Sequence, residues 1–397
     1  MSVIVTEAHL RTALYVIRSL GRKGVMVVCV SEEKKGIGLA SKYCWKRKVV
    51  PSPKNDPDRY LREIEGLVEA YAVRVIIPIH ENSLFLFSQP EIRKRFKSVE
   101  IPISDYSILQ KAADKGELIK IASSLGIPVP QTYFIDDLSR LEEVTKKIDY
   151  PAIIKVRLEK NVNPGPNNRY KKVYNPTECI EWYKTLHEKQ PFPLIQEIIK
   201  GYGCGFFALF DKKGKLIASA GHRRIREQFA DGGPSTFCES YYHPKIWEYG
   251  EKLLTHLGWY GVAMVEFKMD HRNGEPTLME INPRFWGTTP VAILSGVDFP
   301  YLLYKTALGE KVSDKYTFTT GVKLRFLKED IHAFVRDFKK ERNLLKKIDL
   351  STRFLLDLLN PFVREGIISL DDIGPSIFYL TGKYPSWMLS NRDKEAI

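Results

Sequence analysis

The sequence predicts a mixed fold: a parallel α/β domain first, an α+β middle, and a mostly helical C-terminal extension. Three observations lead to this prediction. The first third alternates short apolar runs with helical spacing, the middle is rich in strand-like runs joined by turns, and helical spacing returns beyond residue 310. At 397 residues, the chain is long enough for two or three domains.

The N-terminal domain is predicted from its buried-type strands. Parallel strands are covered by helices on both faces, so they read as continuous apolar runs. The first strand is followed by Thr6-Glu7-Ala8-His9 and not by G-x-G-x-x-G, which argues against a nicotinamide dinucleotide site there. The expected strands are Val3–Val5, Val25–Val30, Lys48–Val50 and Val75–Ile79, and the expected helices are His9–Leu20 and Asp58–Tyr71.

The middle of the chain begins with one long expected helix, Ser104–Leu125, which ends before Pro128 and Pro130. Antiparallel strands and two covering helices follow. The expected strands are Ala152–Val156, Leu194–Ile199, Cys204–Phe210 and Leu216–Arg226, and the helices are Pro176–Lys189 and Pro244–Leu257.

The C-terminal extension is expected to contain a basic helix over Asp330–Ile348. A helix of this kind can lie on a membrane surface. We favour a solvated face on a packed helix, because its charges are mixed with apolar residues at core spacing.

The composition excludes several classes of protein. The chain has no apolar run near the ~20 residues that span a bilayer, and its first residues do not resemble a signal peptide. Its five scattered cysteines form no C-x-x-C pair, which argues against a disulfide framework or a zinc knuckle. The net charge of +13 is spread along the chain without a nucleic-acid-binding motif. We therefore expect a cytoplasmic protein without a nucleic-acid partner or membrane span.

The most informative segment is the predicted hairpin Gly261–Gly287. Its first strand carries Glu266, and its second carries Glu280, Asn282 and Arg284 at alternate positions, which share one face of a sheet. Carboxylate and amide oxygens suit Mg²⁺ bound together with substrate phosphates. The alternative is a solvated polar face.

The register of this hairpin decides between the two interpretations. A two-residue turn at Asn273-Gly274 would place Glu266 opposite Ile281 and separate the carboxylates. A three-residue loop, residues 272–274, pairs Glu266 with Glu280 and keeps the apolar residues, including Met279, on the other face. We predict the three-residue loop and the metal site.

The chain resembles the ATP-grasp superfamily, in the branch of carboxylate–amine ligases related to carbamoyl phosphate synthetase and biotin carboxylase. Four segments carry this resemblance up to residue 310. They are Ala113-Asp114-Lys115 before Leu125-Gly126-Ile127-Pro128-Val129-Pro130, then Tyr150-Pro151-Ala152-Ile153-Ile154-Lys155, then Gln196-Glu197-Ile198-Ile199, and finally Glu266 with Glu280-x-Asn282-x-Arg284.

The resemblance implies ATP and Mg²⁺ (or Mn²⁺) as cofactors and a role for each segment. Lys115 and Lys155 would bind phosphates, residues 196–199 (Gln196, Glu197, Ile198 and Ile199) would hold adenine, and Glu266, Glu280 and Asn282 would bind the metal. Lys155 and Arg284 would act in catalysis. The segment Gly203–Phe207 lacks the carboxylate that many relatives use for ribose, which leaves this role to Glu197 or to a looser contact.

The resemblance also implies a pre-ATP-grasp domain (1–108), a small subdomain with a lid near residues 158–172 (109–200), a central subdomain with the metal site (201–310) and the extension (311–397). Four residues are substrate-binding candidates: Glu81, Arg224, Arg226 and Gly233. Arg224 and Arg226 are expected on one face, where guanidinium groups could bind a carboxylate.

The activity that the resemblance implies is ligation of a small-molecule carboxylate, such as an amino acid or peptide, to an amine through an acyl phosphate, with release of ADP and phosphate. Two alternatives stay open: an ATP-binding protein without ligase activity, and a carboxylase or carbamoyl-phosphate-type enzyme. A homodimer is also left open.

Overall fold

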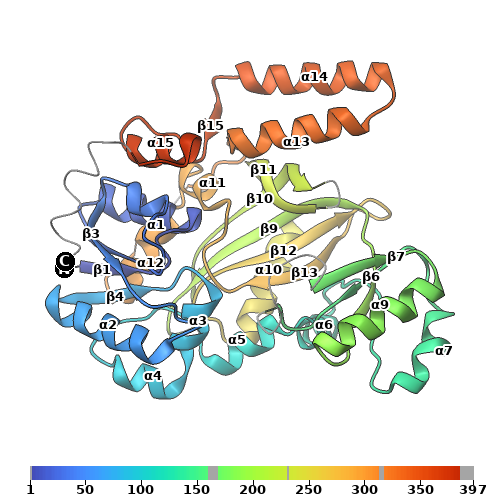
Figure 1. The fold of residues 1–397 in the computed structure, drawn as a ribbon, viewed down its shortest axis with the longest axis horizontal. Coiled ribbons are helices and arrows are strands. Elements are labelled where there is room, and N and C mark those ends of the chain that lie inside the picture. The colour runs from blue at the N-terminus through green and yellow to red at the C-terminus, as the bar shows by residue number, and fades with distance from the viewer. Residues whose placement is uncertain (1, 160–168, 230–231, 313–316, 385–397) are drawn as a thin grey trace.

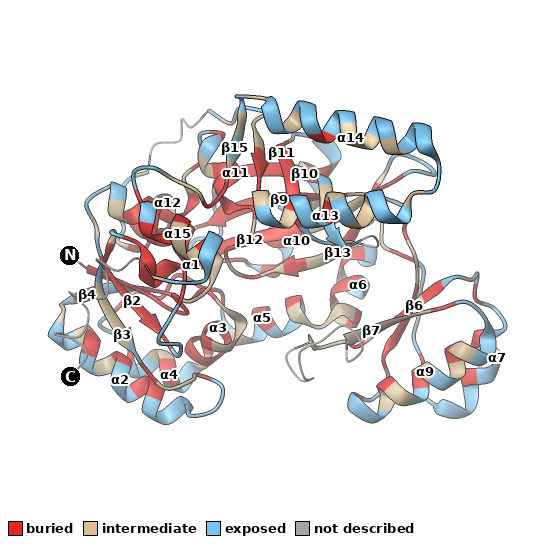
Figure 2. Ribbon diagram, turned by 45° about the horizontal axis from the view of Figure 1, so that its top comes forward, coloured by how far each residue is buried: buried red, intermediate tan, exposed pale blue. Residues whose placement is uncertain are grey.

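A computed structural model of the chain describes residues 2–159, 169–229, 232–312 and 317–384. Three β-sheets form its framework, and helices cover or connect them (Figure 1). Burial is concentrated on the strands and on the helix faces that contact them (Figure 2). None of the helices in these ranges combines the length and the apolar composition that crossing a bilayer requires.

The N-terminal sheet is parallel throughout, as its apolar runs predicted. Its strand order is β3-β2-β1-β4; β1, β2 and β4 are largely buried, whereas the edge strand β3 is mostly half-buried or exposed. The strands are β1 (Ser2–Val5), β2 (Met26–Ser31), β3 (Cys44–Val49) and β4 (Val73–Ile77). The helices of this region are α1 (Arg11–Arg22), α2 (Pro57–Ala70), α3 (Glu81–Ser88) and α4 (Pro90–Arg95), with a 3₁₀ turn η1 at Gly38–Ala40.

The second sheet is small and antiparallel, with the order β5-β8-β6-β7. Its apolar residues, with those of its helices, form a separate hydrophobic core. The strands are β5 (Thr132–Tyr133), β6 (Ala152–Lys155), β7 (Tyr170–Val173) and β8 (Leu194–Glu197). The accompanying elements are η2 (Leu138–Arg140), α7 (Leu141–Thr145) and α9 (Pro176–Lys189).

The third sheet has seven strands in the order β13-β12-β9-β10-β11-β14-β15. Its last two strands come from the segment beyond residue 310, which therefore contributes strands as well as helices. The strands are β9 (Gly201–Phe210), β10 (Leu216–Phe229), β11 (Gly232–Ser240), β12 (Gly261–Asp270), β13 (Pro276–Asn282), β14 (Lys323–Arg325) and β15 (Val363–Glu365). The helices that follow these strands are α10 (Pro244–Leu257), α11 (Thr289–Leu294) and α12 (Phe299–Ala307).

Two helices that the sequence predicts as continuous are broken in the structure. The expected helix Ser104–Leu125 is α5 (Tyr106–Ala113) followed by α6 (Lys115–Ser124). The break occurs because the carboxylate of Asp114 accepts hydrogen bonds from the N–H groups of Gly116 and Glu117 and so caps a new helix.

The expected helix Asp330–Ile348 is likewise α13 (Leu327–Lys340) followed by α14 (Leu344–Leu359). Here Asn343 caps the second helix by accepting from the N–H of Lys346. The two helices form a hairpin in which α13 lies between α14 and the large sheet (Figure 1).

The end of the described chain returns to the N-terminal domain through helix α15 (Ile373–Thr381) and the loop before it. Asp372 is buried and accepts from Arg18 on α1 at 2.9 Å and from the Ser41 hydroxyl at 2.7 Å. Two remote parts of the sequence therefore share one buried ion pair. The domain boundaries after residues 108, 200 and 310 stay predictions.

Candidate active site

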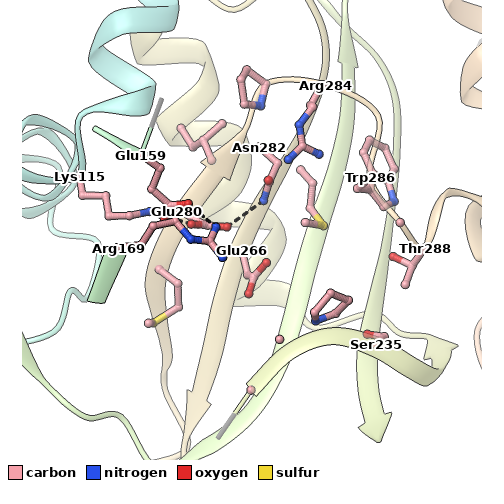
Figure 3. A pocket seen from close by; sticks show the side chains of 18 of the residues that line it. Lys115, Glu159, Arg169, Ser235, Glu266, Glu280, Asn282, Arg284, Trp286 and Thr288 are labelled. Carbon is pink, nitrogen blue, oxygen red and sulfur yellow. Dashed lines mark hydrogen bonds and ion pairs between the residues drawn. The ribbon is translucent and has the colours of Figure 1, made fainter. Parts of the chain in front are cut away.

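A cavity of about 800 Å³ lies where the small sheet, the break between α5 and α6, and the large sheet meet. It contains most of the residues selected from the sequence (Figure 3). Those residues are Glu81, Lys115, Lys155, Arg224, Gly233, Glu266, Glu280, Asn282 and Arg284. The adenine candidates, residues 196–199, and Arg226 do not line it.

The β12–β13 hairpin brings Glu266 and Glu280 directly opposite each other, as predicted. The predicted three-residue loop is wrong, because Asp270 pairs with Glu275 around a four-residue loop. The Asp270 carboxylate binds the N–H and the guanidinium of Arg272, which folds the loop back onto the strand.

A bulge compensates for this longer loop. Met279 is left without a cross-strand partner, so the register shifts by one residue and Glu280 still faces Glu266. Met279 was expected on the apolar face, but as the bulge residue it lines the cavity. Leu278 is buried in the core next to it.

Lys115 is the first residue of α6 and points its ammonium group at β13. Its Nζ lies 2.8 Å from Glu280 and 3.2 Å from Glu159. Burial alone would lower the pKa of Lys115, but the two carboxylates raise it above its ordinary value. The helix break at Asp114 is what gives Lys115 this position, and Asp114 is itself fixed by Arg157 at 2.9 Å.

The two facing carboxylates have opposite pKa shifts. The Lys115 charge holds the pKa of Glu280 well below its ordinary value, although burial opposes this. Burial raises the pKa of Glu266, Arg224 at 2.7 Å opposes the rise, and the charge of Glu280 adds to it. The residual repulsion between the two glutamates is a cost that a cation between them would remove.

The donor set fits Mg²⁺ or Mn²⁺. Both carboxylates and the amide of Asn282 come from neighbouring positions on one sheet face, and hard cations prefer such oxygen ligands. Asn282 here donates from Nδ2 to Glu280 at 3.2 Å. No group of three His, Cys, Asp or Glu side chains in the described ranges forms a metal cluster, so the remaining ligands would have to come from phosphate and water.

Lys155 lines the cavity and has no counter-ion among the described residues. No hydrogen bond or ion pair reaches its ammonium group from another described residue. Burial and the nearby Lys115 charge lower the pKa of Lys155 to about 8, against the attraction of Glu280. A half-buried, unpaired ammonium group of this kind is suited to binding an anion such as a phosphate.

Arg284 follows strand β13, and Glu81 is the first residue of helix α3. Across the cavity, Nη2 of Arg284 lies 3.4 Å from Oε1 of Glu81. Glu81 therefore interacts with the proposed catalytic arginine. The expectation that Glu81 holds a substrate amine stays a prediction, and the long contact leaves both groups able to take other partners.

Arg224 and Arg226 do not share a face, contrary to the prediction. The register of β10 with β11 shifts between them, which leaves Ile225 as a bulge. Arg224 faces the cavity and pairs with Glu266 and Glu227. Arg226 turns to the opposite face and pairs with Asp330 at 2.8 Å and with Asp357 on α14 at 2.8 Å.

The predicted adenine segment lies at the end of β8, beside β12. The amide of Gln196 donates to Thr132, and Lys268 donates to the carbonyl of Ile199. Glu197 pairs with Arg272 at 2.8 Å. Adenine and ribose binding by this segment stay predictions. The predicted lid falls mostly on residues 160–168, outside the described residues.

The structure adds a set of polar side chains that sequence reasoning did not select. His222, Ser235 and Trp286 line the cavity, are 1%, 5% and 1% exposed, and keep polar atoms that no group in the described residues satisfies. Phe207 stacks on His222 at 4.9 Å and on Trp286 at 4.2 Å, which holds both rings in place.

Burial and the Arg224 charge lower the pKa of His222 to about 3, so its ring is neutral near pH 7. We call His222, Ser235 and Trp286 the neutral end of the cavity. The charged end consists of Lys115, Lys155, Glu159, Glu266 and Glu280. Ser235 and Trp286 lie on the side away from Lys115 and Glu159 (Figure 3). Trp286 lies in the loop after β13, two residues past Arg284, and no feature of the sequence marks it as a cavity residue.

Comparison with known proteins finds relatives for part of the sequence and for the fold. Residues 193–329 match the profile of a family described as "ATP-grasp in the biosynthetic pathway with Ter operon". The large chain of carbamoyl phosphate synthase from Pyrococcus furiosus is 26% identical over 184 residues, which is 44% of this chain. This chain spans only 16% of that relative's length.

Two groups of solved structures share the fold. The biotin carboxylase domain dimer of the Hydrogenobacter thermophilus 2-oxoglutarate carboxylase, bound to MgADP, ADP and bicarbonate, matches with a TM-score of 0.65 at 17% identity, over 80% of this chain and 72% of that one. An L-amino acid ligase from Bacillus licheniformis matches with a TM-score of 0.59 at 14% identity, over 78% of this chain and 74% of that one.

Proposed function

We propose that this chain, which contains an ATP-grasp domain, is an ADP-forming ligase that joins a carboxylate to an amine. One observation carries the proposal. Two lysines, two facing glutamates and an asparagine converge on one cavity, and its other end is lined by buried polar atoms that have no hydrogen-bond partner in the part of the chain that the structure describes. The first group suits a metal–triphosphate, and the second suits a polar organic substrate.

The charged end would bind the triphosphate. Lys115 and Lys155 would contact phosphate oxygens as point charges. Glu266, Glu280 and Asn282 would hold Mg²⁺ or Mn²⁺, which would supply positive charge to offset that of the phosphates. Because Lys115 is now paired with Glu280, binding would exchange partners: the carboxylate would turn to the metal, and the lysine would turn to phosphate.

The neutral end would bind the carboxylate substrate. Trp286 and Ser235 offer an N–H and an O–H without protein partners, and the Nε of Arg284 is also unpartnered. A carboxylate can accept from all three groups. Neutral His222 offers one donor and one acceptor and would bind a neutral or amine-bearing part of the substrate.

The reaction would proceed in two steps. An oxygen of the substrate carboxylate attacks the γ-phosphorus, the bond from γ-phosphorus to the bridging oxygen breaks, and ADP leaves with that electron pair. The amine then attacks the acyl carbon and phosphate leaves, while the amine loses a proton. Phosphoryl transfer needs positioning and charge neutralisation more than a protein nucleophile, and Lys155 and Arg284 would offset the charge on the transferred group.

The test is ADP release measured across amino acids offered singly and in pairs, with hydroxylamine added to trap the acyl phosphate as a hydroxamate. We expect ADP release to depend on a carboxylate and to be lost in Glu280→Gln. Glu275→Gln is the matched control, because Glu275 lies on the same hairpin and pairs with Lys245 outside the cavity. ADP release that is independent of any carboxylate, or equal in Glu280→Gln, would contradict the proposal.

A carboxylase-type reaction is a second candidate, and the similarity to carbamoyl phosphate synthase and to a bicarbonate-bound biotin carboxylase domain favours it. Bicarbonate would then take the place of the organic carboxylate. ADP release that requires bicarbonate and is indifferent to amino acids would support this candidate over the ligase.

A further inference from the structure

Glu159 holds two cations of the cavity at once. Its Oε1 lies 3.2 Å from Nζ of Lys115, and its Oε2 lies 2.8 Å from Nη1 of Arg169. Sequence reasoning selected neither Glu159 nor Arg169, yet both line the cavity. Figure 3 shows the three side chains converging beside Glu280. Because lysine and arginine bind carboxylate and phosphate oxygens alike, a phosphate group could take the same two contacts.

Arg169 stands next to Lys155 because the ladder of the small sheet continues one residue before β7. The N–H of Val156 donates to the carbonyl of Arg169 at 2.9 Å, and Lys155 is paired with Tyr170. The Nε of Arg169 is buried and has no partner among the described residues. Arg169 therefore brings to the charged end a guanidinium group whose capacity for hydrogen bonds is only partly used.

Glu159 does not join the two facing glutamates as a third carboxylate ligand for a metal. In the described ranges, no three His, Cys, Asp or Glu side chains lie close enough together to hold a metal ion. The two oxygens of Glu159 instead face an ammonium group and a guanidinium group. These contacts are those of an anion bound in a cationic site.

A triphosphate and Glu159 compete for these cations. Under the proposed function Lys115 contacts phosphate, and a carboxylate 3.2 Å from its Nζ would repel the phosphate oxygens. The described lining of the cavity contains seven Lys and Arg side chains and four Glu side chains. When Glu159 leaves, this positive excess grows and favours another anion in its place.

The position of Glu159 allows it to leave. It lies past the end of β6, four residues after Lys155, and its side chain is 35% exposed. The carboxylate can therefore turn to water, and its charge is not left buried without a partner. Lys115 and Arg169 then become available to phosphate oxygens.

We propose that Glu159 occupies the place of a phosphate group at the charged end, and that Arg169 binds the triphosphate together with Lys115 and Lys155 once Glu159 is displaced. This inference rests on the proposed function, because that function supplies the triphosphate. Glu159 thereby lowers the affinity of the cavity for nucleotide, and Arg169 is a third phosphate-binding cation.

The first test is the affinity for inorganic triphosphate, measured by titration calorimetry at pH 6.5, where Lys155 is charged. Inorganic triphosphate tests the cations without the predicted adenine contacts. Glu159→Gln should lower the dissociation constant about tenfold, because two cations are released for phosphate. Arg169→Gln should raise the dissociation constant about tenfold, because one charged contact is lost. An unchanged affinity in either variant, or a weaker affinity in Glu159→Gln, would overturn the inference.

Two matched controls lie on the same part of the fold but outside the cavity lining. Glu143→Gln removes a carboxylate of α7 that pairs with Lys147. Lys171→Gln removes a cation of β7 that lies over the ring of Trp182, 4.0 Å from its centroid. Neither change should alter the dissociation constant for triphosphate. Equal effects of the controls and the cavity variants would assign the change to overall charge and overturn the inference.

The second test separates displacement from a structural role of Glu159. In an Arg169→Gln background, Glu159→Gln should improve the affinity less than in the wild type, because only Lys115 is then released. The unfolding temperature of the free Glu159→Gln protein should fall slightly, since two ion pairs are lost, while its affinity rises. A structural role would lower both together, and that result would overturn the inference.

The outcomes also separate this inference from the proposed function. If wild type and Glu159→Gln bind triphosphate equally and ADP release still depends on a carboxylate, this inference alone fails. If neither protein binds triphosphate, the proposed function fails with it.

Discussion

The two ends of the cavity differ in how their polar groups are satisfied. At the charged end, Lys115, Glu280 and Glu266 each have an ionic partner within 2.8 Å. At the neutral end, His222 and Trp286 are almost completely buried and keep nitrogen atoms without a partner among the residues described. An unsatisfied buried polar atom costs about 1–3 kcal/mol, whereas a paired charge has recovered most of its desolvation cost.

This difference separates two kinds of binding. Apart from Lys155, the groups of the charged end are already paired, so a metal–triphosphate would enter mainly by exchanging ionic partners. No described residue satisfies the polar atoms of the neutral end, so a bound substrate with polar atoms would supply their partners. We therefore expect the charged end to control turnover, and the neutral end to control which substrate is accepted and how stable the protein is.

The largest effect is expected at the charged end. Glu280→Gln removes a metal ligand and the main partner of Lys115, and should lower the rate of ADP release roughly a thousandfold. The measurement is a coupled assay for ADP, with Glu275→Gln as the control. A loss smaller than about tenfold would break the distinction between the two ends, because Glu280 would then be a structural residue.

The second prediction concerns acid stability at the neutral end. The pKa of His222 is about 3 in the folded protein, against 6.5 for an exposed histidine in an unfolded chain, so neutral His222 favours folding at and above pH 6.5. This contribution to the free energy of unfolding is lost as the pH falls below 6.5. The loss should reach about 3 kcal/mol by pH 4.

His222→Phe keeps an aromatic ring on Phe207 and cannot titrate. It should flatten the pH dependence of the unfolding free energy, measured by urea denaturation between pH 7 and pH 4. His243→Phe, at a histidine whose relative exposure is higher, is the control and should keep the wild-type slope. An unchanged slope in His222→Phe would show that the buried ring does not carry the effect.

The third prediction concerns Lys155. With its pKa at about 8, the ammonium group is charged below that pH and neutral above it. If it binds phosphate, kcat/KM for ATP should fall about tenfold for each pH unit above 8. Lys155→Arg keeps its charge at every accessible pH, so its profile should lack this limb. Identical pH profiles for wild type and Lys155→Arg would show that the charge of Lys155 does not contribute to phosphate binding.

The smallest expected effect is at Trp286. Trp286→Phe removes the unpartnered N–H and retains an aromatic ring against Phe207. It should raise KM for the carboxylate substrate about tenfold and leave KM for ATP unchanged, as the loss of one hydrogen bond predicts. Trp247→Phe is the matched control, because its indole N–H already donates to Ser219. An equal rise in KM for the carboxylate substrate and for ATP would show that the two ends of the cavity do not bind separate substrates.

The pairing of Glu266 with Glu280 was predictable because this pairing agrees with the two-residue period of a strand and keeps the apolar residues on the other face. The loop length and the bulge that produce this pairing were not predictable. The bulge at Met279 offsets the longer loop held by Asp270, and neither feature changes the alternation of polar and apolar residues. The same reason explains the error at Arg226: one bulged residue, Ile225, puts Arg226 on the face opposite Arg224.

The helix breaks were missed for a related reason. The apolar spacing runs through Asp114 without interruption, since α5 and α6 contribute to the same core. Only the capping geometry of Asp114 reveals the break, and Lys115 owes its position to it. The neutral end was not predictable, because the stack of Phe207 with His222 and Trp286 joins three segments that are remote in sequence.

The ion pair between Arg18 and Asp372 has a consequence for how the protein is made. Domains tend to fold as they leave the ribosome, N-terminal part first. Arg18 is only 5% exposed in the finished protein, yet its carboxylate partner is synthesised 354 residues later. Removing one partner of a buried pair costs about 3–5 kcal/mol. The first domain to emerge during translation is therefore among the last to reach full stability.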